Sequence, residues 1–370
     1  MKTHFLVLLL SFFSFTGISQ VINTATLDTT GGQQIGNASI GAYLDMYYGY
    51  NTNQPAGSNI PYYVTSSRHN EMSINLAYID VRYQAERVRV RIVPGFGTYV
   101  NANYTNEPGS LKNLIEANAG IKLIAKRNIW LDVGVLGSPY TNESAISKDH
   151  LMYTRSLAPE YVPYYLSGAK LSMPLNKKLN ANFYILNGWQ QIQDNNNGNS
   201  IGTQLEYRPN ANHLFNWDTY VGDERSIYNP TNRVRYFTDI YWLYNAGKKW
   251  SFNSCVYVGR QDQKTNQNVK SSHYWWQGNL IASYAFTKKL FLSARLEYFS
   301  DPDQMMINSL DVTGFEGGSG GLCLNYRITE KSLFRVEGRY FFTTTDQYLT
   351  YANTTSNQMA WLIGNLTIWF

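Results

Sequence analysis

The chain has 370 residues, of which 44% are hydrophobic and 15% charged, and its formal net charge is +5. Its mean hydropathy of −0.35 would suit a soluble protein, and after residue 19 no apolar stretch approaches the ~20 residues of a membrane-spanning helix, which excludes helical membrane proteins. The unusual feature is the aromatic content of 15%, with 30 Tyr, 17 Phe and 9 Trp, because such rings are favoured in β-strands and at membrane interfaces.

Residues 1–19 have the pattern of a cleaved secretory signal peptide. A basic start and the apolar run 5–15 are followed by Gly17 and Ser19, three and one residues before a cut ahead of Gln20. The run is too short to span a bilayer as a helix. Residues 20–370 contain no linker or shift in composition, so we expect a single domain there.

Sixteen segments of this domain have strand character, because apolar side chains recur at every second position. In Lys289–Ser300, for example, Leu292 and Leu296 alternate with Arg295 and Glu297. Many segments are about ten or more residues long, which exceeds the ~5 to 6 residues of globular strands and matches the ~9 to 11 of strands that cross a bilayer. The expected strands are Gly36–Tyr50, Glu71–Gln84, Arg87–Tyr99, Lys112–Ala125, Ile129–Leu136, Val162–Met173, Leu179–Gly188, Ser200–Arg208, His213–Gly222, Arg233–Asn245, Lys248–Arg260, His273–Thr287, Lys289–Ser300, Gly318–Thr329, Lys331–Thr343 and Asn357–Phe370.

The second of these segments, Glu71–Gln84, changes phase along its length. Its apolar positions run through Met72, Ile74 and Tyr78 and then shift to Ile79 and Val81. A β-bulge would produce such a slip, and so would a misjudged register.

The connections between the segments alternate between short and long. Short turns fall at Gln84–Arg87, Lys126–Asn128, Pro174–Lys178, Pro209–Asn212, Ala246–Gly247, Lys288 and Glu330. Long loops fall at Asn51–Asn70, Gly137–Tyr161, Gln261–Ser272, Asp301–Gly317 and Thr344–Ser356. A two-sheet sandwich has no reason to sort its loops in this way, whereas short periplasmic turns and long extracellular loops are typical of outer-membrane barrels. We therefore predict an all-β fold: one transmembrane antiparallel β-barrel of about 16 strands, in contact with outer-membrane lipid.

The last segment ends on an aromatic residue. Leu366, Ile368 and Phe370 lie on one apolar face, and the last strand must pair with the first so that the sheet has no free edge in hydrocarbon. This terminus also resembles the sorting signal that is read by the barrel assembly machinery, so we predict that machinery as a partner.

Two adjacent stretches, TRSLAPEYVPYYLSGAKLSMPL and LNGWQQIQDNNNGNSIGTQLEYRPN, resemble a known family. They carry Arg155 in a loop, Pro163 and Gly168 at a strand entry, and Asn187 to Asn196 at a loop tip. The family is Putative beta-barrel porin-2, also called OmpL-like, of Gram-negative outer membranes. The resemblance is specific over residues 150–210 and architectural elsewhere. It implies a porin-like channel, and the substrates of the family are mostly undefined. Our own prediction is a channel for passive diffusion of small hydrophilic solutes, with no cofactor and no nucleic-acid partner.

Charged side chains on the polar faces would line the lumen of such a barrel. The basic candidates are Arg87, Arg89, Arg91, Lys122, Arg208, Arg233, Arg235, Arg295, Arg327, Arg335 and Arg339. The acidic candidates are Glu116, Asp132, Glu206, Asp218, Asp239, Glu297 and Glu337. The basic excess predicts a modest anion preference, and the alternative is that the opposite charges pair across strands and cancel.

The loop Gly137–Tyr161 lies between the fifth and sixth expected strands, where general porins fold a loop into the lumen. Its segment ISKDHLMYTRSL reads as a short helix, so Lys148, Asp149, His150 and Arg155 are candidates for a constriction. A loop that caps the outside of the barrel is an equal alternative.

Other functions find less support. DNNNGNS, which begins at Asp194, fits a polar turn with positive φ at Asn197 and Gly198 better than a calcium loop. Cys255 and Cys323 are expected to be free thiols, and there is no metal-ligand spacing and no nucleophile context for an enzyme. The runner-up function is a barrel plugged by its own loops that binds a partner. The solute and the oligomeric state are left open.

Overall fold

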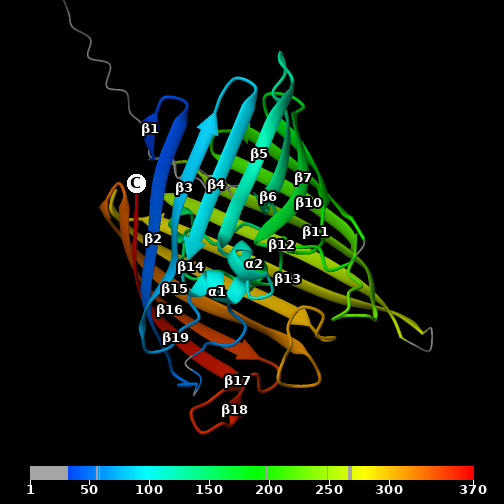
Figure 1. The fold of residues 1–370 in the computed structure, drawn as a ribbon. Coiled ribbons are helices and arrows are strands. Elements are labelled where there is room, and N and C mark those ends of the chain that lie inside the picture. The colour runs from blue at the N-terminus through cyan, green and yellow to red at the C-terminus, as the bar shows by residue number, and fades with distance from the viewer. Residues whose placement is uncertain (1–31, 56, 58, 197, 248, 266–268) are drawn as a thin grey trace, which may run out of the picture.

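The computed structural model in Figure 1 describes residues 32–370 except 56, 58, 197, 248 and 266–268, so the expected signal peptide lies outside the described residues. The strands are β1 (Gln33–Ile35), β2 (Ala38–Asn51), β3 (Met72–Gln84), β4 (Val88–Phe96), β5 (Leu114–Ile124), β6 (Ile129–Gly137), β7 (Tyr165–Pro174), β8 (Leu179–Leu186), β9 (Ser200–Asn210), β10 (His213–Asp223), β11 (Asn232–Asn245), β12 (Trp250–Lys264), β13 (Lys270–Ala285), β14 (Leu290–Asp301), β15 (Phe315–Thr329), β16 (Ser332–Thr343), β17 (Tyr348–Leu349), β18 (Thr355–Ser356) and β19 (Gln358–Trp369). The helices are α1 (Thr98–Asn103), α2 (Leu157–Glu160) and the 3₁₀ helices η1 (Gly109–Asn113) and η2 (Ser147–Asp149).

Sixteen of the strands close into a barrel. Each strand from β2 to β16 pairs antiparallel with the next, β16 pairs with β19, and β19 returns to β2 along a register from Trp361↔Asn51 to Trp369↔Tyr43. β1 pairs with β2, and β17 and β18 form a separate two-stranded sheet. Closure leaves no free edge in the barrel wall, as a structure in hydrocarbon requires. The predicted barrel and all sixteen predicted strands are confirmed.

Several predicted strand boundaries differ from the structure by three or four residues. β4 ends at Phe96 rather than Tyr99, because Gly97 adopts a φ of 131° and turns the chain into α1. β12 continues to Lys264 and β13 begins at Lys270, so the long loop expected at Gln261–Ser272 shortens to residues 265–269.

The phase slip in β3 is a β-bulge. Asp45 pairs with Leu76 while Met46 pairs with Ile74, so Asn75 is the extra residue. The slip therefore lies at Asn75 and Leu76, both buried, rather than after Tyr78 as the pattern of apolar residues had indicated. The bulge turns the Asn75 side chain inward, where it donates a 3.0 Å hydrogen bond to Asp45.

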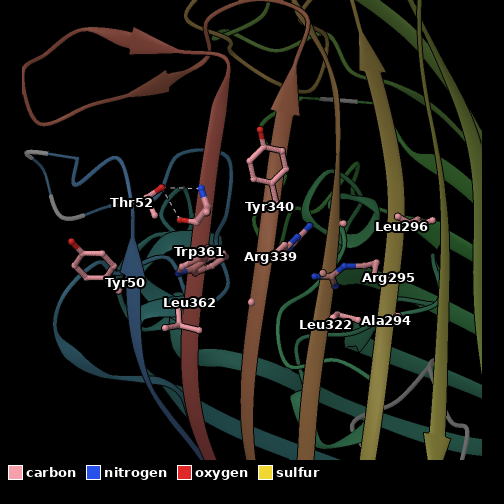
Figure 2. A pocket seen from close by; sticks show the side chains of 14 residues that line it. Tyr50, Thr52, Ala294, Arg295, Leu296, Leu322, Arg339, Tyr340, Trp361 and Leu362 are labelled. Atoms are coloured by element: carbon pink, nitrogen blue, oxygen red, sulfur yellow. Dashed lines mark hydrogen bonds between the residues drawn. The ribbon is translucent and has the colours of Figure 1, made fainter.

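Side chains alternate between the outer wall and the lumen. Figure 2 shows Leu296 and Leu362 on strands that also carry Arg295 and Trp361. Leu296 is 69% exposed and Arg295 only 1%. A shallow groove of about 830 Å³ crosses the outer surface of this wall. Four small residues, Ala294, Gly320, Gly338 and Ala360, are among those that line it.

The connections are sorted by length between the two ends of the barrel. The turn end has connections such as 211–212 and 330–331, and the loop end has connections such as 138–164 and 302–314. In the described part of the chain, no helix combines the length and apolarity needed to cross a membrane. Both cysteines are free, as predicted, and both are buried.

Candidate functional site in the barrel lumen

The lumen is partly filled by the third loop, residues 138–164, which connects β6 to β7. In Figure 1 its helix α2 lies inside the outline of the barrel. Met152, Tyr153 and Leu157 of this loop are 0 to 2% exposed and share one apolar cluster with inward side chains of the barrel wall. The loop was expected to enter the lumen or to cap the outside, and its packing corresponds to the inward arrangement.

Two buried ion pairs on β14 and β16 hold the middle of the third loop. Arg295 bonds to Glu337 at 3.0 Å, and Arg339 bonds to Glu297. The same groups bind the loop backbone: Glu337 accepts the Thr154 N–H at 2.9 Å, and Arg295 donates to the Thr154 carbonyl at 2.7 Å. Because all four charged side chains are at most 7% exposed, the loop supplies hydrogen bonds that these desolvated charges need.

Further contacts fix the first half of the loop. Arg335 on β16 donates to the Ser147 carbonyl at 2.7 Å, and its guanidinium also bonds Asn365 and Thr367 on β19. At the start of the loop, Asn142 donates to Asn253 and Asn279 on β12 and β13 at 2.7 and 2.8 Å. The docked loop therefore contacts the wall from β11 around to β2.

Arg155 organises the third loop rather than lining open water. It is 0% exposed and donates to the carbonyl oxygens of Ser144, Ala145 and Tyr153 at 2.5 to 2.6 Å. Three loop carbonyls thus obtain a charged donor that replaces water.

The other constriction candidates are also largely buried. Lys148 bonds to Asp149 at 2.7 Å, with side chains 5% and 19% exposed. His150 accepts the Ser144 N–H at 3.0 Å. Burial, together with positive Arg155, holds the pKa of His150 well below its usual value, so the ring is neutral. The expected helix over ISKDHLMYTRSL is wrong: only η2 and the start of α2 are helical, because inward side chains and Arg155 satisfy the loop backbone instead.

The first loop, residues 52–71, covers the third loop. Ser66 donates to the Tyr153 hydroxyl at 2.8 Å, and the Tyr161 hydroxyl donates to the Tyr62 carbonyl at 2.7 Å. Arg339 also donates to the Tyr63 hydroxyl at 2.6 Å. Two loops therefore stack inside the loop end of the barrel.

Three basic side chains on the inner wall of β3–β7 keep part of their surface exposed, whereas their acidic partners Asp80 and Asp132 are buried. The side chains of Arg82 and Arg89 are 31% and 30% exposed, and that of Lys170 is 18% exposed. Two guanidinium nitrogens of Arg89 donate to Asp132 at 2.6 and 2.5 Å. Gly120 lies between the two residues in the cross-strand register and has no side chain to separate them. We call the inner face of β3–β7 the open wall.

Acidic partners share the open wall with these bases. Arg91 bonds Asp80 at 2.7 Å and Glu116 at 3.0 Å, and Arg82 bonds Asp80 at 2.8 Å. Asp80, Arg82 and Lys170 were absent from the predicted lumen charges. Ile79, Val81 and Tyr83 are apolar and face outward, so the residues between them, Asp80 and Arg82, face inward. Knowledge of the bulge would have allowed this assignment from the sequence.

The remaining predicted lumen charges have varied surroundings. Asp218 and Asp239 face each other across β10 and β11, are 0% and 1% exposed, and each has one oxygen without a hydrogen-bond partner. Arg208 pairs with Glu206 at 2.8 Å. Arg235 lies over the rings of Trp189 and Trp275. Of the others, Arg87 is exposed in a turn, whereas Lys122, Arg233 and Arg327 are partly exposed.

The Asp194 turn is closed by its own side chains. Asp194 accepts the Asn196 N–H at 2.8 Å, and Asn196 accepts the Gly198 N–H at 2.7 Å. Gly198 does not have the predicted positive φ, and Asn197 lies outside the described residues. Within the described ranges, no three His, Cys, Asp or Glu side chains are grouped as a metal site requires.

The carboxy terminus completes the wall. Phe370 is 51% exposed and Ile368 42%, whereas Leu366 is partly buried, and all three lie on the outward face. Phe370 and Ala42 exchange two backbone hydrogen bonds of 3.1 and 3.2 Å. The last residue is therefore tied to β2.

Solved structures share this architecture at low sequence identity. The outer membrane channel DcaP of Acinetobacter baumannii is 8% identical with a TM-score of 0.60, over 93% of this chain and 100% of that chain. OmpF of Salmonella typhi, in complex with daunomycin, is 12% identical with a TM-score of 0.59, over 90% and 98%. An anion-selective porin from Comamonas acidovorans is 7% identical with a TM-score of 0.56, over 90% and 99%.

No curated protein sequence gives a significant match to the chain. Identities of 12% or less establish the fold and not the solute. The model of the Putative beta-barrel porin-2, OmpL-like family matches residues 37–370, well beyond the stretch of residues 150–210 that first indicated it, and the chain belongs to that family.

Proposed function

We propose that the protein is an outer-membrane channel for passive diffusion of small hydrophilic solutes. The family and the porin relatives support a non-enzymatic channel in the Gram-negative outer membrane. Barrels of about sixteen strands enclose enough width for water. The observation that carries the proposal is a contrast in exposure between two parts of the wall. The charged side chains of β14 and β16 under the third loop are fully buried, whereas Arg82 and Arg89 of the open wall are about a third exposed.

A modest anion preference follows from the charges of the open wall. Five basic side chains, Arg82, Arg89, Arg91, Lys122 and Lys170, stand against three acidic ones, Asp80, Glu116 and Asp132. The pairing lowers the field of each charge but leaves a positive sum, and the field of a pore depends on that sum.

Replacing Arg89 by Gln should reduce this preference. The substitution removes one positive charge from the open wall and frees the charge of Asp132, so we expect the anion-to-cation permeability ratio to fall about two- to threefold. Reversal potentials of single channels in a salt gradient measure the ratio. Arg225→Gln, which neutralises an exposed arginine outside the barrel strands, is the matched control. An equal ratio in wild type and Arg89→Gln would overturn the assignment of the route to the open wall.

A second candidate function is a plugged barrel that binds a partner through its loops. The stacking of the first loop on the buried third loop favours it. Such a barrel would conduct only after the third loop is removed, whereas the proposed channel conducts with the loop in place.

The apolar outward face of Leu366, Ile368 and Phe370 supports a further proposal, that the barrel assembly machinery reads this terminus. Phe370 is exposed to its surroundings although its backbone is paired. The amount of folded Phe370→Ala protein in outer membranes tests this proposal, and an unchanged amount would contradict it.

A further inference from the structure

A basic pocket of about 500 Å³ opens at the loop end of β11–β13. Arg233, Arg260, Lys264 and Lys270 line it together with Asp262. Asp262 is engaged by Arg260 through two hydrogen bonds of 2.8 and 3.0 Å. Arg233, Lys264 and Lys270 then contribute three further positive charges among the described lining residues.

The arrangement of these charges favours an anion between them. Lys264 and Lys270 are direct cross-strand partners at the tips of β12 and β13, and like charges placed directly opposite are destabilising. Arg233 donates to the carbonyls of Pro230 and Asn232 at 2.8 and 2.5 Å, which fixes the guanidinium without neutralising it. A phosphate group has several anionic oxygens, so it can accept charge-assisted hydrogen bonds from Arg233, Lys264 and Lys270 together.

The pocket lies at one edge of the apolar outer band. Outward positions on β12 run from Trp250 through Val256 and Val258 to Arg260. The ten steps along the strand from Trp250 to Arg260 cover about 33 Å, or about 25 Å along the barrel axis at a tilt of about 40°, which equals the usual height of such a band.

Aromatic side chains mark the same edge. Tyr236 and Tyr274 flank Arg260 in the cross-strand register, and Trp276 lies one outward position below Tyr274. These three rings are 41 to 50% exposed, and the Arg260 guanidinium lies 5.3 Å from the centre of the Tyr236 ring. An aromatic row of this kind is typical of the membrane interface, so the basic pocket stands where lipid headgroups lie.

We propose that this pocket binds the phosphorylated headgroup of an outer-leaflet lipid, whose acyl chains lie along Val256, Val258 and Leu280. The inference rests on the proposed outer-membrane location, with the long loops outside. Lysine and arginine clusters next to an apolar surface bind anionic lipid headgroups by charge, and the exposed valines and leucine supply the apolar part of the contact.

Native mass spectrometry of the full-length protein in detergent, titrated with bisphosphorylated lipid A, tests the proposal. We expect a defined one-to-one complex with the wild type. The variant Lys264→Ala, Lys270→Ala should bind at least about tenfold more weakly, which corresponds to about 1.4 kcal/mol. Lipid A that carries a single phosphate should also bind more weakly than the bisphosphorylated form.

The matched control is Lys288→Ala, Lys289→Ala, which removes two exposed lysines from a turn at the opposite end of the barrel. This variant should bind lipid A like the wild type, and heat-modifiable migration on gels confirms that both variants are folded. Equal binding by the Lys264, Lys270 variant, or an equal loss in the control, would overturn the proposal. Competition by inorganic phosphate at the same concentration would assign the pocket to a free anion and would also overturn it. No current is measured, so failure here is distinct from failure of the channel function.

Discussion

Deleting residues Ser144 to Leu157 is expected to raise the unitary conductance about two- to fivefold, because an unobstructed barrel of sixteen strands encloses a wide aqueous pore. The deleted segment supplies Met152, Tyr153 and the backbone groups that Glu337 and Arg295 bind. The strand pairing does not depend on it, since every wall strand bonds to its two neighbours. Planar-bilayer recordings of the purified variant give the conductance directly.

A deletion in an exposed connection provides the control. Residues 351–354 form the exposed turn between β17 and β18, and their removal should leave the conductance within the wild-type range. If the Ser144–Leu157 deletion also leaves it unchanged, the third loop does not limit permeation.

The variant Glu337→Gln is expected to weaken docking of the third loop by about 3 to 5 kcal/mol, the usual effect of removing one partner from a buried ion pair. Arg295 would keep its charge in a site where it is 0% exposed, and the N–H groups of Tyr153 and Thr154 would lose their carboxylate acceptor. The loop should then leave the lumen in a measurable fraction of molecules. Unlike the deletion, this change leaves the chain length intact.

Cys323 reports on that undocking. It is the cross-strand partner of Glu337, is 0% exposed, and its thiol lies against the backbone of Tyr153. In a Cys255→Ser background, a hydrophilic thiol reagent should modify Cys323 at least about tenfold faster in the Glu337→Gln variant than in the parent with Glu337 intact. The reason is that each 1.4 kcal/mol of weaker docking raises the fraction of molecules with an undocked third loop about tenfold. Glu316→Gln, on the partly exposed Glu316 of β15 that bonds to Ser300, should leave the rate unchanged. Equal rates in Glu337→Gln and its parent would refute the anchoring role of Glu337.

The strands could be predicted because their physics is local. Alternation along β14 and β16 separates Leu296 and Val336 from Arg295 and Glu337, and this pattern needs no knowledge of the partner strands. The bulge in β3 was visible as a phase slip but misplaced, since both Asn75 and Leu76 turn inward and only the pairing with β2 reveals the extra residue.

The lumen could be predicted only in part, because its contacts join residues far apart in the chain. Inward folding of the third loop was one of two alternatives, and the choice depends on Arg295, Glu297, Arg335, Glu337 and Arg339, which lie 140 or more residues from the loop positions that they bind. Pairing of wall charges likewise depends on register. In the cross-strand register, Gly321 lies between Arg295 and Arg339, and Gly120 lies between Arg89 and Asp132. Because a glycine has no side chain, the long side chains on either side have room to approach each other.

The burial of Arg155 shows the same limit. A charged residue in a porin loop was expected to face solvent at a constriction, whereas the carbonyls of Ser144, Ala145 and Tyr153 surround its guanidinium. Buried backbone carbonyls need donors, but which residue supplies them is set by the path of the loop.

Single-channel recording of the wild-type protein in a planar bilayer, under a salt gradient, tests the central claim most directly. A conducting barrel with a partly filled lumen predicts discrete current steps with the third loop in place, and a reversal potential displaced toward that of the anion. A baseline that stays flat for the wild type and for the Ser144–Leu157 deletion alike would contradict the claim that this barrel is a channel.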